Sequence, residues 1–154
     1  MQLVFFSQSY GSWVNRVISW WTTPWRGRFN GDWKKGYSHV ELLFNDGMMF
    51  SASQYENRCR YRKHSYTGKA WKRVPLETVS VAEEKIIREF CDKQEGKKYD
   101  YLGVAGFVFG NNDNDKKWFC SEISTKALQQ VGLFSTVEAS KVSPNSLATL
   151  LGVL

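Results

Sequence analysis

The spacing of apolar residues changes from strand-like to helix-like near residue 80, and this change restricts the fold most. Residues 37–44 and 48–53 are largely apolar and flank Asn45-Asp46-Gly47, which is a typical hairpin turn sequence. Arginines alternate with other residues over 58–62, which predicts a third strand with its arginines on one face. Residues 3–6 and 70–76 predict two more strands, so the first half predicts a sheet.

The second half of the chain carries helix signals. Ser80 and Glu83 have the spacing of a capping box, and apolar residues then recur on one face until Gly96. Four more helices are expected, over 13–21, 101–109, 119–131 and from Pro144 onward. Strands followed by helices predict an α+β fold, with an antiparallel sheet packed against helices in one domain that spans residues 1–154.

Composition excludes several classes of protein. The 154 residues are 42% apolar and 23% charged with 3 prolines, which excludes a disordered or low-complexity chain. The cysteines Cys59, Cys91 and Cys120 form no CxxC pair, so we expect no disulfide framework, no metal site and no cofactor. The start lacks a basic signal-peptide region, and the longest apolar run, 101–110, is too short to span a bilayer. These features predict a soluble cytoplasmic protein.

The positive charge of the chain is concentrated in one segment. The net charge is +6, and residues 58–73 hold seven Lys and Arg with no acid, which leaves about −1 for the rest. We call this segment the basic strip, and its expected partner-binding residues are Arg58, Arg60, Arg62 and Lys63. The alternative is a solvated edge strand that its charges protect from pairing.

Only a few residues are suited to nucleophilic chemistry. Of the two histidines, His64 follows Lys63 in the basic strip and is expected on the surface. His39 lies mid-strand on the face shared with Glu41, away from the fully apolar face. Cys120 falls in the first turn of a predicted helix, where the helix N-terminus favours a thiolate. The alternatives are a structural histidine and an ordinary core cysteine.

Two motifs resemble a known superfamily. The strand Ser38-His39-Val40-Glu41 precedes Tyr99-Asp100-Tyr101 and then Phe119-Cys120-Ser121-Glu122. This order resembles the circularly permuted NlpC/P60 (papain-like) superfamily, which includes YiiX/YaeF-like and lecithin–retinol acyltransferase-like (LRAT-like) proteins. The wording is most similar to small phage- or prophage-encoded members, which suggests the cytoplasm of a phage-infected bacterium as the location. The resemblance covers roughly residues 36–131.

The resemblance implies a catalytic site. Cys120 would be the nucleophile, His39 the base and Ser51 the third member, because Ser51 takes the usual position on the adjacent strand. Glu41 is the alternative orienter of the ring, although two strand residues, about 6.5 Å between Cα atoms, make a long reach. Tyr99 and Tyr101 are the candidate oxyanion donors.

The expected function is therefore that of a cysteine-dependent hydrolase or acyltransferase, similar to a thiol peptidase or amidase. Its substrate would contain an amide, isopeptide or ester bond in a peptide, a peptidoglycan peptide or a lipid acyl group. The alternative is a catalytically weak or inactive interaction protein on the same fold. It would use the basic strip and the Trp-rich segment 13–33 to bind an acidic or host protein, a membrane or nucleic acid. Nucleic acid ranks last, because no recognition motif is present.

Overall fold

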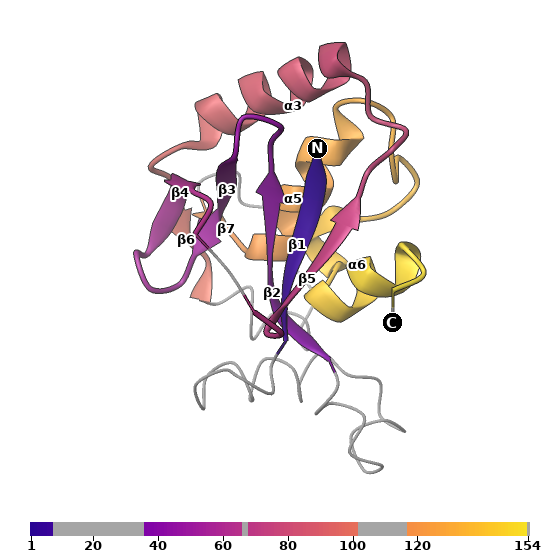
Figure 1. Cartoon of the computed structure of the whole chain (residues 1–154). Helices are drawn as coiled ribbons and strands as arrows, with labels where there is room; N and C mark the ends of the chain where they lie inside the picture. Colours follow the sequence, from indigo (N-terminus) through magenta and orange to yellow (C-terminus); the bar gives the residue numbers. More distant parts are fainter. Residues whose placement is uncertain (8–35, 66–67, 102–116, 154) are drawn as a thin grey trace.

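A seven-stranded sheet forms the centre of the computed structural model, which describes residues 1–7, 36–65, 68–101 and 117–153. The strand order is β5-β1-β2-β3-β4-β6-β7, and every neighbouring pair is antiparallel except β6 and β7 (Figure 1). The strands are β1 (Gln2–Ser7), β2 (Tyr37–Leu43), β3 (Met48–Ser53), β4 (Arg58–Lys63), β5 (Trp71–Pro75), β6 (Lys98–Tyr99) and β7 (Lys117–Trp118).

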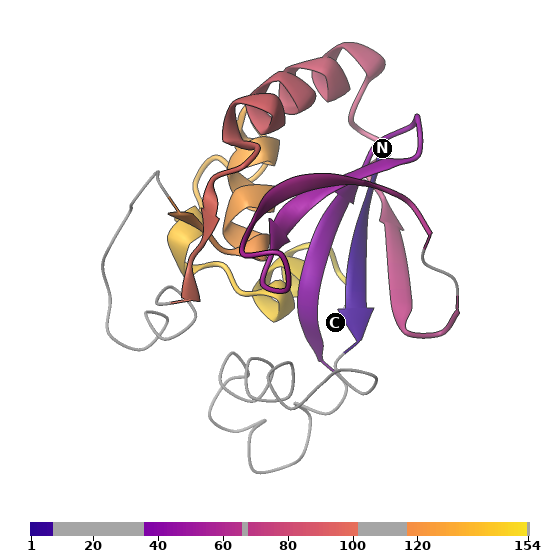
Figure 2. The same ribbon diagram turned by 90° about the vertical axis from the view of Figure 1, so that its left-hand side faces the viewer.

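Helices cover one face of this sheet. The described helices are α3 (Val81–Gln94), α5 (Cys120–Gln129), the 3-10 helix η3 (Ala139–Lys141) and α6 (Pro144–Leu150). Figure 2 shows α5 and α6 side by side against the sheet, with α3 across one end. The predicted α+β class with an antiparallel sheet against helices is therefore confirmed at this level for the described residues.

Local signals place the ends of several elements where the sequence predicts them. The Ser80 hydroxyl accepts a hydrogen bond from the Glu83 N–H, and the Glu83 carboxylate accepts one from the Ser80 N–H at 2.8 Å, so the capping box is formed. Gly47 in the β2–β3 turn has a φ of 83°, which glycine adopts without steric cost. The hairpin and the start of α3 are thus set by short-range contacts.

The two faces of the sheet carry different side chains. Leu3, Phe5, Val40 and Leu42 point to the helix side and belong to the main core, which also includes Cys120. The residues between them point to the opposite face, where Val4, Leu43 and Met49 form a smaller apolar cluster with Trp71. By the same alternation, His39 and Glu41 belong to this second face, opposite Phe6 and Val4 of β1. His39 and Glu41 thus lie on the face away from the helices, whereas Cys120 lies on the helix side.

Some elements differ from the prediction or cannot be compared with it. The two-residue strands β6 and β7 were not predicted, because so short a segment leaves no periodic pattern. The helix expected at 13–21, the Trp-rich segment and nearly all of the helix expected at 101–109 lie outside the described residues. In the part of the chain that is described, no helix has the length and apolar character needed to cross a membrane.

Candidate active site

Cys120 is the first residue of α5, which begins directly after the short strand β7 and the N-cap residue Phe119. Phe119 is the N-cap with an extended backbone, and its N–H donates to the Glu122 carboxylate at 3.2 Å. Ile123 and Ala127 lie on the same helical face as Cys120 and are fully buried. The sulfur therefore lies at a helix N-terminus, where backbone N–H groups favour negative charge. Cys120 itself has no exposed surface.

His39 is bonded on one side to Glu41. The His39 Nε2–H donates to Glu41 Oε1 at 3.0 Å. The imidazole side chain is 18% exposed, whereas the Glu41 side chain is 1% exposed. A buried carboxylate in this position fixes the orientation of the ring and leaves Nδ1 as the nitrogen that can exchange a proton with another group.

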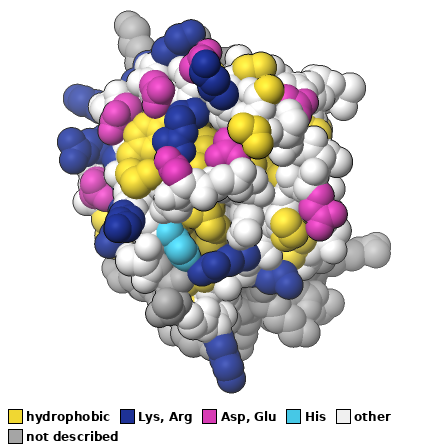
Figure 3. All heavy atoms as spheres, turned by 45° about the horizontal axis from the view of Figure 1, so that its top comes forward, with side chains coloured by type: hydrophobic (Ala, Val, Ile, Leu, Met, Phe, Trp, Pro, Cys, Tyr) yellow, Lys and Arg dark blue, Asp and Glu magenta, His cyan; other side chains and the backbone are white. Residues whose placement is uncertain are grey.

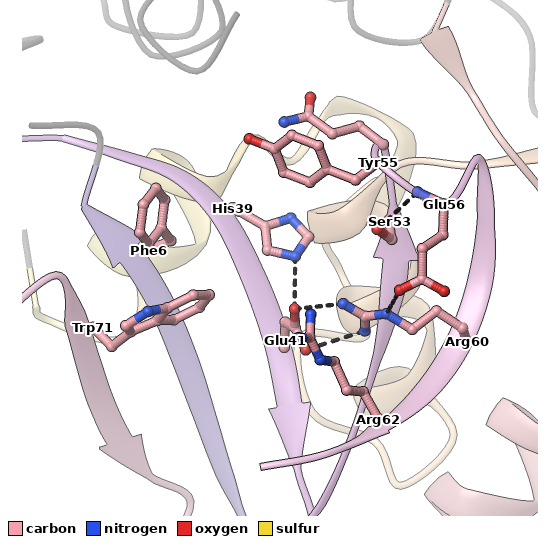
Figure 4. A pocket seen from close by; sticks show the side chains of 10 residues that line it. Phe6, His39, Glu41, Ser53, Tyr55, Glu56, Arg60, Arg62 and Trp71 are labelled. Atoms are coloured by element: carbon pink, nitrogen blue, oxygen red, sulfur yellow. Dashed lines mark hydrogen bonds and ion pairs between the residues drawn. The ribbon is translucent and has the colours of Figure 1, made fainter. Parts of the chain in front are cut away.

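Glu41 is also held by a buried arginine. Arg60 on β4 donates from Nη2 to Glu41 Oε1 at 2.9 Å and from Nη1 to Oε2 at 3.2 Å, which is a bidentate pair. The Nε–H of Arg60 donates to Glu56 Oε1 at 3.0 Å. Figure 4 shows the resulting chain of charges, which runs from His39 through Glu41 and Arg60 to Glu56 in the β3–β4 turn.

These contacts change the ionisation of both central groups. Burial alone would raise the pKa of Glu41, but His39 and Arg60 outweigh it and lower the pKa to about 2. Burial alone would lower the pKa of His39, but the charge of Cys120, a side-chain hydrogen bond with Cys120 and the bond with Glu41 raise it to about 10. The ring is therefore protonated at neutral pH and lies between a carboxylate and a sulfur.

The pairing of β2 with β3 stops before it reaches His39. The β2–β3 ladder pairs Leu42 with Phe50 and Leu43 with Met49, and in the described residues it extends no further toward His39. At the next step the Val40 carbonyl accepts a hydrogen bond from the Ser51 hydroxyl at 2.7 Å. At this point a side-chain donor therefore contacts the β2 backbone. The His39 ring nevertheless interacts with Cys120 at the start of α5.

The preference for Ser51 as the residue that orients His39 is wrong in the structure. Its hydroxyl donates to the Val40 carbonyl, and Glu41 holds the ring instead. The distance between the Cα atoms of His39 and Glu41 on one strand argued against a direct bond between their side chains. The long side chains of His39 and Glu41 lie on the same face and span that distance. The short side chain of Ser51 instead donates to the backbone of β2.

The two candidate oxyanion donors differ in their surroundings. Tyr101 is 54% exposed, and its hydroxyl donates to the Gln54 carbonyl at 2.6 Å, so this hydroxyl is already engaged. Tyr99 is 3% exposed, and its ring packs against Phe119 with the ring centroids 5.9 Å apart. Burial raises the pKa of Tyr99 well above its usual range, and the charge of Cys120 adds to this rise. Tyr99 therefore lies near Cys120 as a neutral phenol.

Burial dominates the ionisation of the other two cysteines, Cys59 and Cys91. Cys59 is fully buried in β4, and burial raises the pKa of its thiol to about 12. Cys91 is fully buried in α3, and burial together with the charge of Asp92 raises the pKa of its thiol. Both thiols stay protonated at neutral pH, so they serve as internal controls for Cys120. No group of three His, Cys, Asp or Glu side chains within the described ranges could hold a metal ion.

The basic strip does not form a uniform positive face. Arg60, expected to bind a partner, is 6% exposed and belongs to the site, because it reaches across β3 to Glu41. Arg58 is 59% exposed and lies 3.7 Å from Glu56, which partly neutralises it, while Arg62 and Lys63 are exposed. On the face seen in Figure 3, basic side chains lie among acidic ones.

A cavity of about 340 Å³ lies on the face of the sheet that carries His39 and Glu41. Its other lining residues come from β1, β3, the β3–β4 turn, β4 and β5: Phe6, Ser53, Gln54, Tyr55, Glu56, Arg60, Arg62 and Trp71. The sequence pattern did not indicate Glu56, Phe6 and Trp71, which reach the site from elements far apart in the chain. Arg60 lies opposite Ser51 in the β3–β4 register, a pairing that the alternation along one strand does not reveal.

Comparison of the chain with protein-family models, curated proteins and solved structures found no match.

Proposed function

We propose that this protein is a cysteine-dependent hydrolase or acyltransferase with Cys120 as nucleophile, His39 as the proton-transfer group and Glu41 as the residue that orients His39. The observation that carries the proposal is the placement of the His39 ring, which donates to the buried Glu41 carboxylate and whose pKa is raised by the nearby Cys120 sulfur. A nucleophile, a base and a residue that orients the base are the parts that acyl transfer requires.

The chemistry follows from the protonated ring. The Cys120 sulfur attacks a substrate carbonyl, a carbon–sulfur bond forms, and the proton of His39 passes to the leaving nitrogen or oxygen as its bond to carbon breaks. The neutral His39 then takes a proton from water, or from an acceptor alcohol or amine, which attacks the thioester and releases the sulfur. Backbone N–H groups at the start of α5 and the Tyr99 hydroxyl are the donors proposed for the oxyanion.

We also propose a permuted papain-like arrangement for the described part of the chain. Two facts support it: the histidine strand β2 precedes the cysteine helix α5 in the chain, and α5 packs against β2 and β3. The carboxylate on the histidine strand itself, rather than a polar residue on the next strand, sets this site apart from the expected pattern.

Acetyl transfer from p-nitrophenyl acetate tests the proposed function. We expect release of p-nitrophenol and an acetyl group on Cys120, detected by intact-protein and peptide mass spectrometry. His39→Gln should slow acetylation by about two orders of magnitude or more, and Cys120→Ser should abolish the thioester. Cys91→Ala is the matched control and should change neither. Acetylation that is equal in wild type and His39→Gln would exclude a Cys–His site.

One observation favours the alternative of a non-catalytic interaction protein, namely that Cys120 has no exposed surface. Iodoacetamide separates the two functions. An active site should label at Cys120 in the native protein at pH 7, while Cys59 and Cys91 should label only in urea. If all three thiols label only in urea, the fold serves binding rather than catalysis.

A further inference from the structure

The cavity beside His39 is lined by aromatic side chains on two sides. Phe6 on β1 and Trp71 on β5 are register partners, and their ring centroids are 4.8 Å apart at an interplanar angle of 50°. Tyr55 projects from the β3–β4 turn and is 76% exposed. Figure 4 shows Tyr55 on one side of His39 and the Phe6–Trp71 pair on another. A flat group that enters the cavity would therefore meet aromatic surfaces in two directions.

The charges that line the cavity are paired with one another. Glu41 is held by His39 and Arg60, and Glu56 by Arg60 and Arg58. Each lining carboxylate among the described residues therefore already has a cationic partner. A charged group that entered the cavity would compete with the members of these ion pairs, whereas an uncharged group leaves the ion pairs intact.

Size and position narrow the choice of ligand further. A volume of about 340 Å³ is at the low end for ligand pockets, which suits one ring rather than a long acyl chain. His39 and Glu41 line the cavity, so a group held there lies beside the proposed proton-transfer residue.

We propose that this cavity binds an uncharged aromatic group of the substrate, in contact with Phe6, Trp71 and Tyr55. This inference rests on the proposed function, because it assigns the cavity to the substrate of the Cys120 site. The substrate class is then an amide or ester with an aromatic ring close to the scissile carbonyl, such as a peptide with an aromatic side chain.

A non-reactive ligand tests the cavity without using the thiol. N-benzylacetamide would be titrated into the Cys120→Ala protein and followed through the backbone amide signals of Phe6, His39 and Arg62 by NMR. We expect saturable shifts and an affinity about fivefold higher than that of N-hexylacetamide, because stacking on aromatic rings adds to the apolar contact. Trp71→Leu and Tyr55→Ala should each weaken benzyl binding by about three- to tenfold. Phe90→Ala, which changes a half-buried ring on α3, should leave it unchanged.

A second measurement connects the cavity to the thiol. N-benzyl-iodoacetamide should alkylate Cys120 with saturation and faster than iodoacetamide at low concentration, despite its larger size. Trp71→Leu should remove the advantage of the benzyl reagent, whereas Phe90→Ala should leave the rates of both reagents unchanged. Benzyl binding without any labelling of native Cys120 would contradict the proposed function and keep the aromatic cavity. Absence of saturable shifts would overturn the cavity proposal, as would equal affinity for the hexyl ligand or no effect of Trp71→Leu and Tyr55→Ala.

Discussion

Replacing Glu41 with glutamine tests the ionic network at its centre. In the structure the carboxylate accepts hydrogen bonds from His39 and, through both oxygens, from Arg60. Glutamine keeps the size of the side chain but has one acceptor oxygen and no charge. One of these contacts therefore becomes donor against donor, and two buried cations lose the anion between them.

The expected change in the pKa of His39 follows from the bond that is lost. The rise from 6.5 to about 10 corresponds to about 5 kcal/mol in favour of the charged ring, and the charge of Cys120 supplies part of it. A hydrogen bond with a charged partner contributes about 1.5–3 kcal/mol, and one pKa unit corresponds to about 1.4 kcal/mol. Glu41→Gln should therefore lower the pKa of His39 from about 10 to roughly 8–9.

The same substitution should destabilise the fold. Removing one member of a buried ion pair costs about 3–5 kcal/mol, because the other charge stays buried without its partner. Arg60 keeps its bond with Glu56, so we expect the lower value, about 3 kcal/mol. For a domain of this size the melting temperature should fall by about 6–12 °C.

NMR titration and urea unfolding measure these two effects. The chain has only two histidines, so His64→Gln assigns the His39 signals directly. Glu56→Gln is the matched control, because Glu56 contacts Arg60 but is not bonded to His39, and its effect on the pKa of His39 should be small. The reasoning is refuted if Glu41→Gln leaves that pKa at the wild-type value, or if Glu56→Gln lowers it equally.

Three further predictions concern the same site. Ser51→Ala should leave the pKa of His39 unchanged in an NMR titration, and should cost about 1 kcal/mol in urea unfolding because a buried carbonyl loses its donor. The Glu41 contribution to stability is full above pH 4.5 and should be lost as pH falls toward 2, whereas the His39 contribution is full below pH 6.5 and should be lost as pH rises through 10. Melting temperatures across pH measure both changes. If the melting temperature of Glu41→Gln falls between pH 4.5 and 2 as steeply as that of the wild type, the predicted contribution of Glu41 is contradicted. Tyr99→Phe should slow acetylation of Cys120 by about tenfold or more but leave iodoacetamide alkylation unchanged, since only acyl transfer develops an oxyanion; equal slowing of both would exclude that role.

Local sequence determined the parts of this protein that depend on near neighbours. The Asn45-Asp46-Gly47 turn closes the β2–β3 hairpin, and the Ser80–Glu83 box starts α3, because each is satisfied by bonds within a few residues. The start of α5 at Cys120 also follows from local spacing. Strand alternation likewise put His39 and Glu41 on one face. The α+β class and two members of the candidate site, Cys120 and His39, were therefore predictable from the sequence.

The tertiary structure decided which side chains meet. Ser51 donates to the Val40 carbonyl, and the ring of His39 donates to Glu41 instead. The sequence predicts that Arg60 is a surface charge. Because β4 pairs with β3, however, its side chain reaches across β3 and donates to the buried Glu41 carboxylate. Whether a polar side chain is buried and paired depends on groups that distant strands bring beside it, and the spacing of residues along one strand does not contain that information.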